Sequence, residues 1–237
     1  MGFLAYLIVG LVAGLAAVER KGFLQAMLSR PIVLGPLTGW ALGDVSAGLL
    51  LAPPLELLWL GAVNLGAAVP VHEAVGTVAV VGGAVLAAHG MGGPVTPQIA
   101  ALAALVAMPA AYLGRLGERG AEGWNERIAL RAEAELDGHH PGAAARCNLY
   151  GLLVSFAIAA ILAPLAVAAA AAVVPAVLRA APGLSDPLGV GFLALVAAGS
   201  AAAAKALRAR AAPLAFFGAA AGTAVLGLTA VLFGRAL

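Results

Sequence analysis

The uncharged stretch at residues 147–178 limits what this sequence can fold into. It contains two prolines, Pro164 and Pro175, and no charged residue. As a single helix its 32 residues would run about 48 Å, longer than a bilayer is thick, so we expect it to be kinked or split. The whole chain of 237 residues is 63% hydrophobic and only 10% charged, whereas a soluble domain carries about 25% charged residues. The sequence therefore predicts an integral membrane protein.

Apolar runs of this kind are far longer than the roughly ten residues of a membrane barrel strand, and they favour an all-α, polytopic fold. We expect residues 1–237 to form a single membrane domain. Its first span should end before Arg20 and Lys21; no basic residue precedes it, which argues against a cleaved signal peptide. The later apolar runs bring the total to about eight spans, at 31–50, 52–69, 74–88, 98–114, 147–178, 189–204 and 211–234.

Two of these runs, 74–88 and 98–114, are short for a membrane crossing, which needs about 20 residues. A turn-forming segment rich in Gly and Pro, residues 89–97, joins them. Short, interrupted apolar segments are typical of the broken or re-entrant helices of transporters, and ordinary short spans are the alternative.

Basic residues gather in three clusters, whose positions predict the topology. The clusters are Arg20, Lys21 and Arg30; the arginines within 115–146; and Lys205, Arg208 and Arg210. If all three are cytoplasmic, an even number of spans separates each pair and the N-terminus lies outside.

Residues 115–146 form a polar loop with five arginines and six acidic residues. We interpret it as a cytoplasmic pair of charged helices around Trp124, either a solvated hairpin or a docking platform for a soluble partner. The net charge of the chain is only +2, so we expect no nucleic-acid partner.

Glu56 is the most informative polar residue, because it lies in the otherwise apolar run 49–69, with Asn64 eight residues further on. A carboxylate inside a membrane helix costs roughly 2.5–3.5 kcal/mol on insertion scales, so it persists only with a partner, a cavity or a role. A carboxylate accepts hydrogen bonds and an amide both donates and accepts, which suits the vicinal hydroxyls of a neutral sugar or polyol. The alternative is a structural ion pair between Glu56 and a residue such as Arg30.

Five further polar residues are candidates for the same pocket: Glu19, Gln25, Asp44, His72 and Glu73. Each also has an ordinary structural interpretation. Asp44 would end a helix at the interface, Glu19 and Gln25 would be interfacial residues, and His72 and Glu73 would form a polar cap.

The sequence argues against several kinds of chemistry. No further metal ligands stand at suitable spacing near His72, and Cys147 is the only cysteine, so we expect neither a metal site nor another cofactor. An intramembrane aspartyl protease needs a second membrane aspartate besides Asp44, and the other two aspartates lie in polar segments.

At these residues the chain resembles the IIC membrane subunit of the mannose/fructose/sorbose family of phosphotransferase sugar permeases. The order and spacing match over residues 10–90, and length and hydropathy agree across the rest. The resemblance rests on Arg30-Pro31-Ile32-Val33, Leu42-Gly43-Asp44, Leu55-Glu56-Leu57, Leu60-Gly61 and the run 64–70. Two departures stand out: His72 takes the place of a common acidic residue, and Ala52-Pro53-Pro54 replaces a usual glycine pair.

The resemblance implies a subunit of the bacterial inner membrane that binds a hexose or amino sugar together with a IID membrane partner. The sugar would pass inward to a soluble IIB protein, which phosphorylates it within a IIA/IIB relay. The IIC subunit would be a transport subunit and no enzyme. Glu56 and Asn64 would lie at the sugar, with residues 19–25 nearby, and a core would move against a scaffold that mediates homo-oligomerisation.

The residues alone leave two other functions open. One is a stand-alone secondary transporter with Glu56 as a proton or cation site. The other is a non-transporting membrane scaffold or sensor with the same fold.

Overall fold

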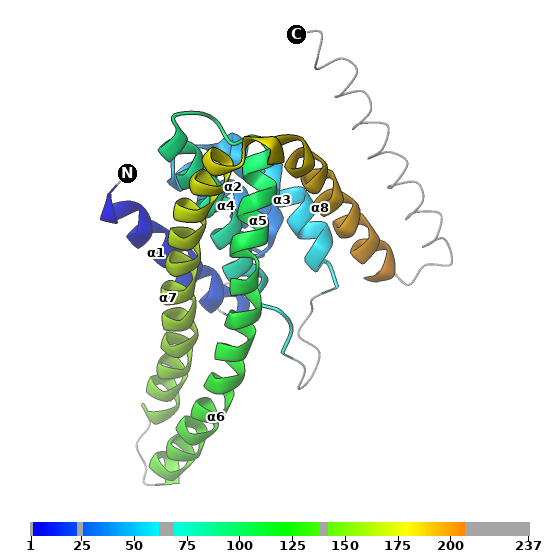
Figure 1. Cartoon of the computed structure of the whole chain (residues 1–237). Coiled ribbons are helices and arrows are strands. Elements are labelled where there is room, and N and C mark those ends of the chain that lie inside the picture. Colours follow the sequence, from blue (N-terminus) through cyan, green and yellow to red (C-terminus); the bar gives the residue numbers. More distant parts are fainter. Residues whose placement is uncertain (1, 23–25, 62–68, 138–141, 207–237) are drawn as a thin grey trace.

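The computed structural model describes residues 2–22, 26–61, 69–137 and 142–206. In these ranges the chain forms eight α-helices and one short 3-10 helix, η1 (Figure 1). Their bounds are α1 (Phe3–Arg20), α2 (Pro31–Ala41), α3 (Val45–Trp59), α4 (Glu73–Met91), α5 (Pro97–Ala107), α6 (Pro109–Asp137), α7 (Ala143–Ala180), η1 (Pro182–Leu184) and α8 (Ser185–Ala206). Gln25, Asn64 and the predicted span 211–234 lie outside the described residues.

Helix α4 is the centre of the molecule. Its residues from Glu73 to Ala88 are all buried, because α1, α2, α3, α5, α6 and α7 pack against it. Glycines permit close packing: a Cβ added to Gly83 would lie 2.6 Å from the Ala170 side chain of α7, and one added to Gly76 would lie 2.6 Å from the Trp59 ring of α3. Small residues at helix contacts are typical of membrane bundles, where packing rather than hydrophobic burial drives association.

Helices α2 and α3 form a short antiparallel hairpin, so the predicted division into spans 31–50 and 52–69 is wrong. The chain turns at Gly43, which has a φ of 85°, and the Asp44 side chain then caps α3 by accepting a hydrogen bond from the Ala47 N–H at 3.0 Å. Helix α3 continues through Leu51, where the two predicted spans divide, and through Pro53 and Pro54. At 11 and 15 residues, the two helices are about 16 and 22 Å long, so each is shorter than the hydrocarbon core.

The runs predicted at 74–88 and 98–114 belong to longer helices. Helix α4 has 19 residues, enough to cross a membrane, and ends where Gly92 adopts a φ of 75°. Helices α5 and α6 follow each other across Met108 and give a helical stretch of 39 residues, Pro97–Glu135. Helices α2 and α3, earlier in the chain, form a pair of short helices that the sequence did not predict.

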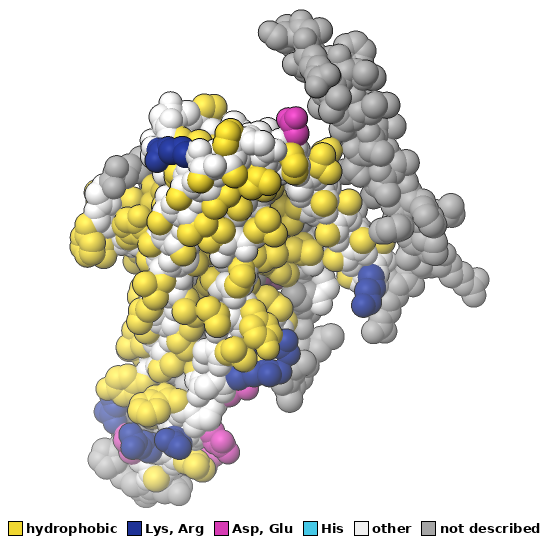
Figure 2. All heavy atoms as spheres, viewed as in Figure 1, with side chains coloured by type: hydrophobic (Ala, Val, Ile, Leu, Met, Phe, Trp, Pro, Cys, Tyr) yellow, Lys and Arg dark blue, Asp and Glu magenta, His cyan; other side chains and the backbone are white. Residues whose placement is uncertain are grey.

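Helix α7 is one continuous helix of 38 residues, so the predicted split of 147–178 does not occur. Pro164 and Pro175 both lie inside the helix. With a length of about 57 Å, α7 extends together with α6 beyond the rest of the bundle (Figure 1). The predicted polar loop 115–146 is thus largely a helical hairpin, and Figure 2 shows charged side chains gathered at its tip and hydrophobic side chains along its flanks.

Within the described residues, five helical stretches are long and apolar enough to cross a membrane: Phe3–Arg20, Glu73–Met91, Pro97–Glu135, Ala144–Ala180 and Pro182–Ala206. Helix α3 is a shorter apolar helix. This arrangement confirms the all-α, polytopic membrane fold. The total of about eight spans stays a prediction, because one of them lies outside the described residues.

Candidate functional site

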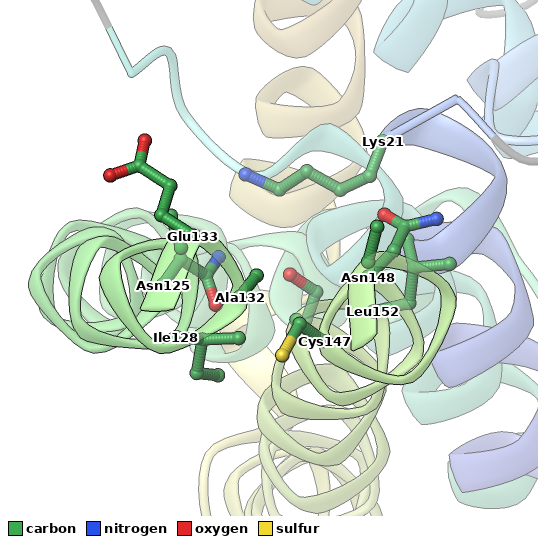
Figure 3. Close-up of a pocket in the computed structure, with 12 residues that line it drawn as sticks. Lys21, Asn125, Ile128, Ala132, Glu133, Cys147, Asn148 and Leu152 are labelled. Carbon is green, nitrogen blue, oxygen red and sulfur yellow. The ribbon is translucent and has the colours of Figure 1, made fainter. Parts of the chain in front are cut away.

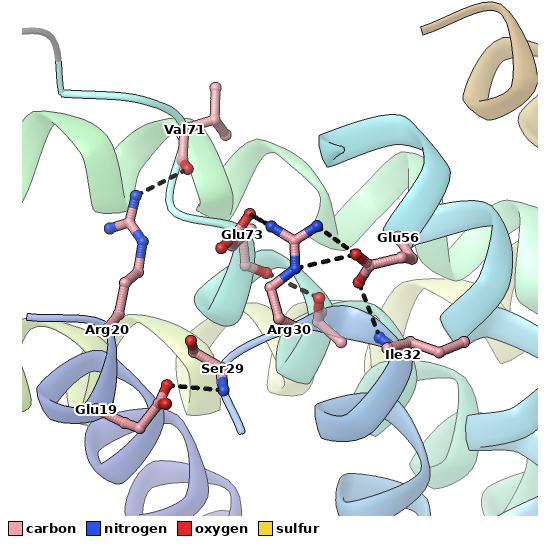
Figure 4. A network of polar contacts seen from close by, with 9 residues as sticks. Glu19, Arg20, Ser29, Arg30, Ile32, Glu56, Val71 and Glu73 are labelled. Carbon is pink, nitrogen blue, oxygen red and sulfur yellow. Dashed lines mark hydrogen bonds and ion pairs between the residues drawn. The ribbon is translucent and has the colours of Figure 1, made fainter. Parts of the chain in front are cut away.

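Charged side chains meet where α1 ends and where α2 and α4 begin, as Figure 4 shows for one part of the group. We call this group the charged cluster. Its members are Arg20, Lys21, Arg30, Glu56, His72, Glu73 and Glu118.

Arg30 organises one half of the charged cluster. It is the N-cap residue of α2, and its Nε donates to Glu56 Oε1 at 3.0 Å while its Nη2 donates to the same oxygen. Its Nη1 lies 3.7 Å from Glu73 Oε2, and the other oxygen of Glu56 accepts from the Ile32 N–H at 3.1 Å. Arg30 thus joins a carboxylate of α3 to a carboxylate of α4, and the ion pair that was the alternative for Glu56 is present.

Glu118 of α6 organises the other half, and the sequence analysis missed it. Its side chain is only 1% exposed, accepts from Arg20 Nη1 at 2.8 Å, and lies 3.6 Å from Lys21 Nζ and 3.5 Å from His72 Nε2. Glu118 was assigned to the solvated polar loop, whose first turns are instead packed inside the bundle. Gly114 and Ala121 share its helix face at spacings of four and three residues, and this pattern of small residues is the signal that indicates burial.

His72 fixes the start of α4. Its Nδ1 accepts from the Val75 N–H at 3.3 Å, which leaves Nε2 facing Glu118. Its backbone N–H donates to the Ala111 carbonyl of α6 at 3.0 Å, and a Cβ added to Gly114 would lie 2.8 Å from its Cβ. The polar cap considered for His72 is therefore present, and it is docked tightly against α6.

Two predicted residues lie apart from the charged cluster. Glu19 is buried, and its carboxylate accepts from the Ser29 N–H at 3.0 Å. It also lines an apolar groove of about 320 Å³ between α1 and α2. Asp44 lies at the other end of α2 from Arg30, about 16 Å away along the helix.

Asp44 acts as a helix cap in the turn between α2 and α3, outside the candidate membrane spans. Its partial burial opposes ionisation, but hydrogen bonds from Ser46 and from the Ala47 N–H outweigh that effect and lower the pKa of Asp44 below its ordinary value.

The charged cluster offers guanidinium and ammonium donors beside carboxylate acceptors, so it can bind a ligand that both donates and accepts hydrogen bonds. In the part of the chain that the structure describes, no group of three His, Cys, Asp or Glu side chains is arranged to hold a metal ion.

The apolar helices and the charged cluster inside their bundle define a multi-pass helical protein of the bacterial inner membrane. The chain belongs to the family of PTS system sorbose-specific IIC components, which it matches over residues 3–235. The family resemblance seen in residues 10–90 is thereby confirmed and extends over nearly the whole chain.

A curated relative and two solved structures are similar to the chain. It is 41% identical over 69 residues to the putative N-acetylgalactosamine permease IIC component 2 of Escherichia coli (strain K12). That match covers 29% of this chain and 51% of the relative, so it spans about half of the relative's length. A structure described only as a membrane protein has a TM-score of 0.71 at 20% identity, covering 100% of this chain and 97% of that chain. The mannose transporter ManYZ in complex with microcin E492 (MceA) has a TM-score of 0.57 at 20% identity, covering 100% and 96%. At this identity the two structures support the fold.

Proposed function

We propose that this chain is the sugar-translocating IIC subunit of a phosphoenolpyruvate-dependent sugar phosphotransferase system. It binds a neutral hexose or amino sugar within the membrane and passes it inward to a IIB partner for phosphorylation. It works with a IID membrane subunit and a IIA carrier, in a homo-oligomeric assembly. Its membership of the IIC family supports the proposal, and the name of the E. coli relative favours an amino sugar.

The observation that carries the proposal is the convergence of Arg30, Glu56 and Glu73. A guanidinium only donates hydrogen bonds and a carboxylate only accepts them, whereas each hydroxyl of a sugar does both. Each carboxylate oxygen has two lone pairs, so Glu56 can accept from a sugar hydroxyl while it stays paired with Arg30. The Glu56 side chain is 16% exposed and that of Glu73 only 6%, so Glu56 is the more accessible acceptor.

The remaining predicted residues have secondary parts in this proposal. Asn64 and Gln25, which lie outside the described residues, add amide groups to the sugar site. Glu19 and His72 hold the backbone beside the site through the hydrogen bonds that they accept. Asp44 caps α3 at the far end of α2 and so positions the helix that carries Glu56.

Uptake of labelled N-acetylgalactosamine and mannose by cells that express the complete complex tests the proposal. We expect Glu56→Ala to lower the apparent affinity about 10- to 150-fold, because a hydrogen bond to a charged group contributes about 1.5–3 kcal/mol and each 1.4 kcal/mol is tenfold. Glu135→Ala is the matched control, because Glu135 is an exposed carboxylate paired with Arg146 on the polar hairpin. Asn64→Ala should also weaken uptake.

Three results would count against the proposal. Unchanged uptake in both Glu56→Ala and Asn64→Ala would remove the sugar site. Gradient-driven flux by the purified chain in liposomes, without IIB and IID proteins, would favour a stand-alone transporter. A chain that binds no sugar in a thermal-shift screen would be a scaffold or a sensor.

A further inference from the structure

A cavity with several polar side chains in its lining lies between α6 and α7, in the hairpin that extends beyond the charged cluster (Figure 3). Its volume is about 500 Å³, within the range of about 300–1,000 Å³ that is usual for small-molecule sites. The small residues Ala129, Ala132 and Gly151 leave room between the two helices. Six polar residues contribute to its lining: Lys21, Asn125, Glu133, Cys147, Asn148 and Ser155.

Two buried polar atoms of this cavity, Ser155 Oγ and Asn125 Oδ1, have no hydrogen-bond partner among the described residues. Ser155 is only 1% exposed. The two side chains come from facing helices, since a Cβ added to Gly151, one turn before Ser155 on α7, would lie 3.3 Å from Asn125 Oδ1. Buried polar groups in proteins are nearly always satisfied by protein, water or ligand. A ligand that both donates and accepts would satisfy this pair.

The charges of the cavity favour a neutral ligand. Lys21 contributes one ammonium and Glu133 one carboxylate (Figure 3). Lys21 Nζ is also only 3.6 Å from Glu118 Oε1. The Glu118 carboxylate therefore partly neutralises the positive charge that Lys21 would present to an anionic ligand. A hydrocarbon chain would leave Asn125 Oδ1 and Ser155 Oγ unpaired. Amides and a serine hydroxyl donate and accept at the same time, as the hydroxyls of a polyol do.

Lys21 connects this cavity with the charged cluster, because the same side chain lines the cavity and contacts Glu118. The cavity also lies at the basic end of the molecule. That end holds Arg20, Lys21 and Arg30 of the charged cluster and Arg146, which pairs with Glu135 on the hairpin. A concentration of Lys and Arg is typical of the cytoplasmic face of membrane proteins. A ligand that leaves Glu56 and Glu73 inward would pass on the side of this cavity.

We propose that the cavity between α6 and α7 is a second binding site, which holds a neutral polyhydroxyl ligand on the inner side of the membrane. Ser155, Asn125 and Asn148 bind its hydroxyls, and Lys21 forms the wall toward the charged cluster. The identification of this ligand as the transported sugar rests on the proposed function. The lining itself specifies only a neutral molecule with several hydroxyls.

Cys147 provides the test, because it is the only cysteine of the sequence and lines the cavity. Its rate of labelling by a fluorescent maleimide would be measured on the full chain, in membrane vesicles from cells that express the complete complex. N-acetylgalactosamine and mannose are the probes, with inorganic phosphate as the anionic comparison. At a sugar concentration of about ten times Kd, labelling should slow about tenfold, because only the unoccupied fraction reacts.

Variants link the protection of Cys147 to the cavity. Ser155→Ala combined with Asn125→Ala should remove the protection by sugar, and Ala132→Phe should do the same by filling the space. Ser200→Ala is the matched control, because this α8 serine is no part of the lining. If Cys147 of the Ser155/Asn125 variant is labelled without sugar at the same rate as in the parent protein, the variant has kept its fold.

The inference is overturned if neither sugar slows the labelling of Cys147, or if only phosphate slows it. Glu56→Ala separates it from the proposed function, because this variant should weaken uptake through its lower apparent affinity and keep the protection of Cys147. If Glu56→Ala abolishes protection while the Ser155/Asn125 variant retains it, Cys147 senses the Glu56 site and the second site is refuted. Protection without any uptake would refute the proposed function alone.

Discussion

At the scale of single residues, the charged cluster places several charges where water cannot reach them. Glu118 is 1% exposed and has Arg20, Lys21 and His72 around it. Removing one member of such a group leaves the other charges buried and uncompensated, which costs more than the intact pair contributes. The ion pair Arg146–Glu135 lies on the surface, with side chains 58% and 45% exposed. Water screens this pair, so removing one partner costs little stability.

We therefore expect Glu118→Ala to lower the free energy of unfolding by about 3–5 kcal/mol. Glu135→Ala removes a carboxylate from the same helix, and its effect should stay below about 1 kcal/mol. Denaturant unfolding in mixed micelles measures both. Adding Arg20→Ala to Glu118→Ala should recover part of the loss, because it removes the stranded guanidinium. If Glu118→Ala and Glu135→Ala lowered the free energy of unfolding equally, the buried Glu118 would stabilise the protein no more than an exposed carboxylate does, and the prediction would be wrong.

Sequence reasoning identified some of these residues and missed others for physical reasons. Glu56 could be found because a charge inside an apolar run is conspicuous, and Arg30 was named as its alternative partner. Glu118 could not be found in this way, because it lies among arginines and other acids in 115–146. Its burial depends on α1 and on residues 71–73 packing over α6, which is tertiary information.

At the scale of elements, the α2–α3 hairpin is held by direct contact of its backbones. A Cβ added to Gly48 of α3 would lie 2.7 Å from Pro36 Cα of α2, and one added to Gly35 would lie 2.8 Å from the Ala52 Cβ. Backbone atoms cannot rotate away as the end of a side chain can. The two helices could accommodate a larger residue at Gly48 only by separating.

Gly48→Ala should consequently destabilise the protein by about 1–3 kcal/mol through overpacking. Gly123→Ala is the comparison, because a Cβ there meets nothing within 4 Å inside α6; it should stabilise by about 0.5–1 kcal/mol through the better helix propensity of alanine. Unfolding midpoints of the two variants should move in opposite directions. A Gly48→Ala protein as stable as the parent would show that the hairpin is loosely packed.

The boundaries of elements were the weakest part of the sequence analysis. Gly43 and Asp44 form a turn inside an apolar region, where hydropathy gives no sign of a break. Pro164 and Pro175 indicated that 147–178 is kinked or split, and the helix is not split at either residue. Proline is tolerated inside membrane helices because neighbouring helices and local adjustments satisfy the freed backbone groups. Hydropathy predicted the helices, and proline was a poor guide to their ends.

At the scale of the whole molecule, the distribution of charge gives the bundle two different faces. Arg179, whose Nη2 donates to the Gly90 carbonyl at 3.2 Å, lies at the end of α7 opposite to Cys147 and Arg146. The end with the charged cluster and the polar hairpin holds Arg20, Lys21, Arg30 and Arg146. The positive-inside rule then orients the hairpin toward the cytoplasm.

This orientation predicts which thiols a membrane-impermeant maleimide can reach. Cys147 should react in inside-out vesicles and stay unlabelled in intact cells. In a Cys147→Ser background, Gly183→Cys should show the reverse, because Gly183 is exposed beyond the opposite end of α7. Labelling of Cys147 from outside the cell would invert the topology and place the cavity between α6 and α7 on the wrong side for release.

The enclosure of α4 on every side has a consequence for biogenesis. A helix with this apolar composition enters the bilayer as it is synthesised, before the later part of the chain exists. Helix α7, whose Val167 and Ala170 press on Gly82 and Gly83, is made only after α5 and α6. Newly inserted α4 therefore exposes Gly82 and Gly83 to lipid until α7 has been made and covers them.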